Sequence, residues 1–179
     1  MTGRSVLLLR AVNLGARNRV PMAELRALLA ERTTLQDVST YIASGNVLCR
    51  TPDDTAAACA EVRALIADAF GVDTPVIPRR HDELVAALAR NPFADAAAEK
   101  LVHVMFLEDE PPGDAVAALT PRLVPGERIA LHGRDLWIDY AAGGVHSTRL
   151  TRPVLDRALG VAGTARNVLT VRKLAELTA

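Results

Sequence analysis

The chain has 179 residues, of which 50% are hydrophobic and 23% are charged, so it can bury a sizeable core as one domain or as two small halves. Its 21 basic and 21 acidic side chains cancel, which excludes a global positive field that would attract nucleic acid or an anionic membrane. Arg10 interrupts the apolar start too early for a signal peptide, and no apolar stretch approaches the length of a membrane span. We therefore expect a cytoplasmic protein that does not bind membranes.

No set of cysteine and histidine residues predicts a metal centre or a disulfide framework. Cys49 and Cys59 form no Cys-x-x-Cys pair, and a buried or half-buried free thiol is the usual state of such cysteines. The four histidines share no spacing typical of metal ligands. Glycine-rich phosphate loops and dinucleotide fingerprints are also absent from the sequence. We expect neither a metal ion nor a cofactor.

The first half of the chain predicts the order strand, helix, strand, strand, helix, strand. The second helix ends at Gly71, a typical C-cap residue, and the last strand contains Pro75 and Pro78, which suit only the edge of a sheet. The expected ranges are a strand at Val6–Leu9, a helix from Pro21 to about Leu29, strands at Val38–Ile42 and Val47–Cys49, a helix at Thr55–Phe70 and a strand at Val72–Pro78.

The second half predicts the same order again. A connector helix, Asp82–Arg90, comes first. The expected ranges after it are a strand at Leu101–Leu107, a helix at Asp114–Leu119, strands at Arg128–Leu131 and Leu136–Tyr140, a helix at Arg152–Leu159, a strand at Thr164–Val168 and a helix at Val171–Leu177. This pattern predicts an α+β protein with two ferredoxin-like (split βαβ) halves in tandem. The expected boundaries are 1–80 for the first half, 81–99 for the connector and 100–179 for the second half with its C-terminal helix.

Two polar loops of the first half are expected to converge at one end of its sheet. Ser44-Gly45-Asn46 lies between two apolar runs and is typical of a hairpin turn. The loop from Asn13 to Asn18 follows the first strand, and the crossover helix returns the chain so that both loops emerge at the same end. Gly15 and Gly45 allow backbone N–H groups to approach a ligand closely. The candidate ligand-binding residues are Arg10, Asn13, Gly15, Arg17, Tyr41, Ser44, Gly45 and Asn46, with Arg166 and Asn167 contributed by the second half.

Five segments resemble a known family: Leu8–Gly15, Val20–Leu25, Tyr41–Val47, Asn91-Pro-Phe93 and Thr164–Asn167. Together they resemble the bacterial family called domain of unknown function 1697, over nearly the whole chain. The resemblance implies a pair of ferredoxin-like α+β halves and no established reaction. Ala11 and Ala16 stand where that family commonly has glycine, and Val168 stands where a Trp usually follows the Arg-Asn pair.

The pattern of the two polar loops favours a module that binds a small anionic or nucleotide-like molecule. One alternative is that the Asn and Ser side chains only stabilise turns and helix ends. A second is an enzyme acting on a phosphorylated or nucleotide substrate, with Arg10 or Arg166 stabilising charge and Tyr41 or Ser44 transferring a proton. A third is a protein or nucleic-acid interaction module, including a homodimer through sheet edges. We do not expect base-specific binding of nucleic acid, because the central strands carry no aromatic residue.

Thr148–Pro153 forms a second candidate phosphate site. Thr151 is a suitable N-cap for the helix that follows, and Arg149 and Arg152 flank the positive end of its dipole. The alternative is a solvated loop.

Overall fold

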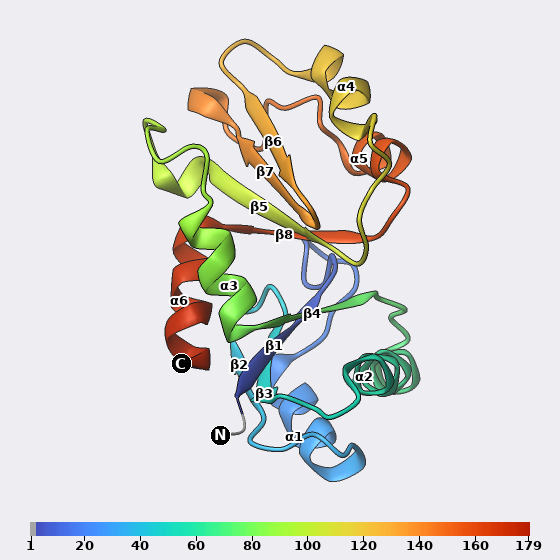
Figure 1. Ribbon diagram of the computed structural model, residues 1–179. Helices are drawn as coiled ribbons and strands as arrows, with labels where there is room; N and C mark the ends of the chain where they lie inside the picture. The colour runs from blue at the N-terminus through green and yellow to red at the C-terminus, as the bar shows by residue number, and fades with distance from the viewer. Residues whose placement is uncertain (1–2) are drawn as a thin grey trace. The chain divides into compact units, whose positions relative to one another are not determined.

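The computed structural model describes residues 3–179, and these residues divide into two compact units. The first unit contains the residues up to Val85 together with Leu174–Ala179, and the second contains Ala86–Lys173. Each unit is built around a four-stranded antiparallel sheet (Figure 1). The predicted α+β class is confirmed. The predicted boundaries at 80 and 100 stay a prediction.

The first unit has the strand order of a ferredoxin-like fold. Its sheet is ordered β2-β3-β1-β4, and every neighbouring pair of strands is antiparallel. Its elements are β1 (Arg4–Leu9), α1 (Met22–Arg32), β2 (Ser39–Tyr41), β3 (Asn46–Arg50), α2 (Thr55–Phe70) and β4 (Val76–Arg80). The strand β4 lies at the edge of the sheet, which explains why Pro78 is tolerated within it.

The second unit repeats this topology with the sheet order β6-β7-β5-β8. The helices α3 (His81–Ala89) and α6 (Val168–Thr178) each contribute residues to both units. The remaining elements are η1 (Glu99–Leu101), β5 (Val102–Leu107), α4 (Ala115–Leu119), η2 (Thr120–Arg122), β6 (Arg128–His132), β7 (Asp135–Asp139), η3 (Ala141–Gly143), α5 (Arg152–Leu159) and β8 (Gly163–Asn167).

The apolar run of β1 is buried on both faces of its sheet. Leu7 and Leu9 point towards the helices, in a core cluster that includes Leu29 of α1 and Ile66 of α2. Leu8 points to the opposite face and is also 0% exposed. This burial on both sides accounts for a continuous apolar strand instead of an alternating one. It fixes the position of β1, and hence of the loop that follows it.

The long helix α2 has clear start and stop signals in the sequence. The side chain of Asp54, at the N-cap, accepts a hydrogen bond of 2.9 Å from the backbone N–H of Ala57. Gly71 ends the helix in the left-handed conformation, with φ of 65°. Within residues 3–179, no helix combines the length and the apolar character that a membrane span needs.

Candidate functional site

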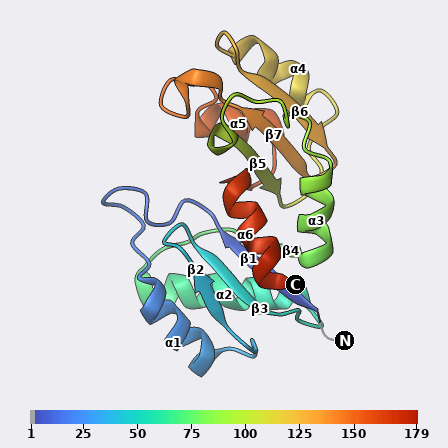
Figure 2. The ribbon, with the colours of Figure 1, turned by 90° about the vertical axis from the view of Figure 1, so that its left-hand side faces the viewer.

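The loop after β1 and the turn after β2 meet at one end of the first unit's sheet. Both strands pair antiparallel with β3, so they run in the same direction and their C-terminal ends lie together. Two hydrogen bonds join the segments: Leu9 N–H donates to the carbonyl of Gly45 at 2.8 Å, and the Asn13 side-chain amide donates to the carbonyl of Ala43 at 2.8 Å. Figure 2 shows the loop extending from the end of β1 before the chain enters α1.

Asn13 holds the β1–α1 loop closed. Its amide nitrogen donates to the carbonyl of Val20 at 2.9 Å, and its side-chain oxygen accepts from the N–H of Val20 at 2.8 Å. The residue itself adopts a φ of 55°, a conformation that Asn tolerates better than most residues. This one side chain therefore connects the start of the loop, its end and the neighbouring turn.

Gly45 and Asn46 are buried residues that stabilise the β2–β3 turn. Gly45 has a φ of 83°, and a Cβ at this position would lie 2.6 Å from Cγ2 of Val12 and 2.8 Å from Cβ of Leu9. Asn46 is 0% exposed, and its amide donates to the carbonyl of Tyr41 at 2.9 Å and to the hydroxyl of Ser44 at 3.2 Å. Gly45 and Asn46 thus stabilise the turn beside the site, and neither is exposed for contact with a ligand.

A pocket of about 490 Å³ opens between this loop, the start of α1 and the β2–β3 turn. Of the candidates predicted from the sequence, Asn13 and Gly15 line it. The other lining residues are Arg19, Val20, Pro21, Met22, Arg26, Thr40, Ile42 and Ala43. We call this cavity the loop pocket. All of its residues belong to the first unit.

The loop pocket contains two arginines that form no ion pair with a carboxylate of residues 3–179. Arg26 donates from Nη1 to the hydroxyl of Thr40 at 2.6 Å, which holds its guanidinium against the wall formed by β2. Among residues 3–179, no carboxylate forms an ion pair with Arg19 or Arg26, nor with Arg17 in the same loop. Four other arginines of the first unit are paired with carboxylates: Arg32, Arg50, Arg63 and Arg80.

The N-terminus of α1 adds partial positive charge to the same pocket. Pro21 occupies the N-cap, and its side chain makes no capping hydrogen bond to the first N–H groups of the helix. Met22, the first residue of the helix, lines the pocket, whereas Glu24 in the first turn does not. An anion in the pocket would interact favourably with these N–H groups and with the helix dipole.

Several predicted residues lie near the loops without lining the pocket. The backbone of Arg10 is fixed by Thr74, whose hydroxyl accepts from the Arg10 N–H at 3.1 Å and donates to the Arg10 carbonyl at 2.6 Å. Tyr41 pairs with Asn46 in the sheet, one residue away from Val47, which faces the helices. The side chain of Tyr41 therefore lies on the sheet face opposite α1.

Arg166 and Asn167 belong to the second unit. Arg166 is 6% exposed and donates to the hydroxyl of Thr164 and to the carbonyl of Ala165, both at 2.8 Å. Burial lowers the pKa of Arg166 to about 10, which still leaves it charged at neutral pH. Asn167 caps α6, because its side-chain oxygen accepts from the N–H of Thr170 at 2.8 Å.

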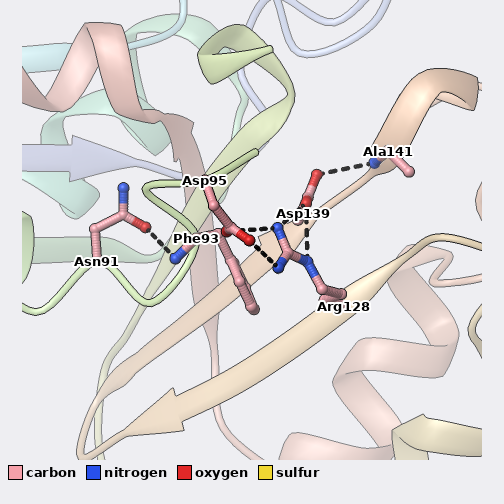
Figure 3. A network of polar contacts seen from close by, with 6 residues as sticks. All are labelled: Asn91, Phe93, Asp95, Arg128, Asp139 and Ala141. Atoms are coloured by element: carbon pink, nitrogen blue, oxygen red, sulfur yellow. Dashed lines mark hydrogen bonds and ion pairs between the residues drawn. The ribbon is translucent and has the colours of Figure 1, made fainter. Parts of the chain in front are cut away.

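The second unit contains a polar network centred on Arg128 (Figure 3). The guanidinium donates to both oxygens of Asp95 at 3.0 and 3.1 Å and, from Nε and Nη2, to Asp139 at 3.1 and 2.8 Å. It also lies 4.7 Å from the centre of the Phe93 ring. Asn91 accepts from the N–H of Phe93 at 3.0 Å, so the Asn-Pro-Phe segment positions this ring. Because two carboxylates surround Arg128, we interpret the network as structural.

The described residues contain no cluster of histidine, cysteine and carboxylate side chains able to hold a metal ion. His103 is a half-buried strand residue whose ring meets Tyr140 edge to face, with 5.1 Å between ring centres. Burial lowers the pKa of His103 and raises that of Tyr140 to about 12. Thr151 does occupy the N-cap of α5, but its side chain makes no capping hydrogen bond.

Sequence reasoning missed the two arginines that line the pocket. Arg19 directly follows the loop from Asn13 to Asn18, so its position in the sequence was a usable signal. Arg26 lies four residues after Met22, so the two side chains share one face of α1. Because helical side chains point towards the N-terminus, this spacing was a usable signal that Arg26 lies near the start of the helix. Ile42 gave no such signal, because an isoleucine at the end of an apolar run is expected to be buried.

The fold and the pocket together define an α+β protein with two ferredoxin-like units and an arginine-containing cavity beside the first sheet. A family model described as "Protein of unknown function (DUF1697)" matches residues 2–137, and the chain belongs to this family. No curated protein matches the chain. Three chains of solved structures match. One of them is the conserved bacterial protein SP0830 from Streptococcus pneumoniae, with 22% identity, 99% of both chains covered and a TM-score of 0.74. This similarity supports the fold.

Proposed function

We propose that the protein binds a small anionic, phosphate-bearing ligand in the loop pocket. One observation carries the proposal: Arg19 and Arg26 both line this cavity, and neither has a carboxylate partner among residues 3–179. Arginine is suited to phosphate because its planar guanidinium can donate two parallel hydrogen bonds. The start of α1 and the open position of Gly15 supply backbone N–H groups for the same ligand.

The pocket size agrees with a small molecule. A volume of about 490 Å³ is within the range typical of ligand sites, roughly 300–1,000 Å³, and is large enough for a nucleotide. A binding function requires no side chain that transfers a proton, whereas the enzyme alternative does. The Ser44 hydroxyl accepts from the Asn46 amide, and the Tyr41 side chain lies on the other face of the sheet, so neither hydroxyl supports the enzyme alternative.

Replacing both Arg19 and Arg26 by Ala should weaken the binding of phosphate-bearing ligands by about 100-fold. Each lost charge-assisted hydrogen bond is worth roughly tenfold or more in affinity. Isothermal titration calorimetry with inorganic phosphate, pyrophosphate and AMP at low ionic strength measures this change. Because the two side chains are exposed, the free energy of unfolding should stay close to that of the wild type.

Arg122→Ala is the matched control, since it removes one exposed arginine from the second unit without touching the loop pocket. Its affinity should equal that of the wild type. Equal binding by the double variant, or no binding of any of the three anions to the wild type, would contradict the proposed function.

A further inference from the structure

The wall of the loop pocket combines polar and apolar groups. Arg19 and Arg26 provide the charge, whereas Met22, Ile42 and Ala43 provide an apolar surface. An inorganic anion would contact only the two arginines. A surface of both kinds fits a ligand in which an apolar group lies next to a phosphate.

Ile42 is the least expected residue of this wall. It adopts a φ of 50°. In that region a β-branched side chain is a clear outlier, whereas Gly or Asn is accommodated with much less strain. The other non-glycine residues with positive φ in residues 3–179 are of types that tolerate it better, being small or Asn/Asp: Ala11, Asn13, Asn18, Asp37 and Ala141.

Core packing does not explain Ile42 either, because the residue is 48% exposed. Leu14 is 57% exposed, and these are the two highest values among the large hydrophobic residues of the described chain. The hydrogen bond from Asn13 to the carbonyl of Ala43 links their immediate neighbours in the chain. Two exposed apolar residues thus occupy adjoining segments beside two arginines that have no ion pair within the described part of the chain.

We infer that the ligand of the loop pocket is an organic phosphate whose apolar group contacts Ile42, which makes Ile42 a specificity-determining residue. The inference rests on the proposed function, since it assumes that the arginines bind the phosphate. A strained backbone at a ligand-facing position is a known feature of binding sites. Here it presents an apolar side chain where an unstrained turn would carry Gly or Asn.

The experiment compares the affinities of phenyl phosphate and inorganic phosphate by calorimetry. The wild type should bind phenyl phosphate about tenfold more tightly, the difference expected when one face of a ring is buried against an apolar side chain. Ile42→Asn should abolish this preference and leave the affinity for inorganic phosphate unchanged. The variant should also be at least as stable as the wild type, because Asn tolerates the left-handed conformation.

Val145→Asn, which changes an exposed hydrophobic residue of the second unit, is the control and should keep the tenfold preference. If the wild type binds both phosphates equally, or if Ile42→Asn retains the preference, the inference is wrong while the proposed function stands. If the wild type binds neither of these phosphates, nor pyrophosphate or AMP, both are wrong.

Discussion

Gly45→Ala should lower the free energy of unfolding by about 3 kcal/mol. The new Cβ would lie 2.6 Å from Cγ2 of Val12 and 2.8 Å from Cβ of Leu9, and both contacts belong to the buried core. Overpacking of this kind costs roughly 1–3 kcal/mol. A Cβ in the left-handed region adds about 1–2 kcal/mol. Urea unfolding monitored by circular dichroism measures the change.

Gly15→Ala separates the cost of overpacking from the cost of the left-handed conformation. Gly15 also has a positive φ, 65°, but a Cβ there would meet no atom within 4 Å. We expect a loss of about 1 kcal/mol, the conformational cost alone. If both variants lose the same stability, then close packing of the turn against β1 does not limit this position, and our account of how the two loops are held together is wrong.

Asp139→Ala should lower the free energy of unfolding by about 2 kcal/mol. The Asp139 side chain is 8% exposed, and it accepts hydrogen bonds from Arg128 and from the N–H of Ala141 at 3.0 Å. Removing it leaves the half-buried Ala141 N–H without this acceptor and Arg128 with one carboxylate fewer. Loss of a partner costs about 1–3 kcal/mol for a buried polar group. Ala141 has a φ of 52°, so the lost bond also supports a strained residue.

Asp95→Ala is the comparison, because the Asp95 side chain binds the same guanidinium but is 73% exposed. Its effect should be smaller than that of Asp139→Ala and should vanish at high salt, where exposed ion pairs are screened. The hydrogen bonds from Arg128 lower the pKa of Asp95 from 3.8. The contribution of this pair is thus present above pH 3.8 and is lost as the pH falls through the lowered value. Equal effects of the two variants at high salt would contradict this interpretation.

Local signals in the sequence were sufficient to predict the order of the helices and strands and most of their ends to within one or two residues. The strand predicted at Val72–Pro78 is found at Val76–Arg80. The helix at Thr55–Phe70 and its stop at Gly71 are found where they were predicted, because the cap and the apolar face agree. The last helix begins at Val168, three residues before the predicted start, since Asn167 provides a cap. The strand β2 ends at Tyr41 and not at Ile42, because Ile42 leaves the extended conformation.

The strand order was sufficient to predict where the candidate site lies, but not which side chains line it. The antiparallel order of the strands puts the loop at Asn13 and the turn at Ser44 at one end of the sheet. Which side chains face a cavity depends on how α1 packs on the sheet. That packing brings Arg26 to Thr40, a contact that the local pattern does not indicate. The local pattern also does not indicate that Asn46 is buried, on the sheet face opposite α1.

Backbone amide chemical shifts measured by NMR during a titration with phosphate show directly whether the loop pocket binds phosphate. We expect the largest changes at the amides of Gly15, Arg19 and Met22, with small changes throughout the second unit. In the variant with Ala at positions 19 and 26, the same changes at Gly15 and Met22 should need about 100-fold more phosphate. Largest changes in the second unit, or none at saturating phosphate, would contradict the assignment of the loop pocket as the binding site.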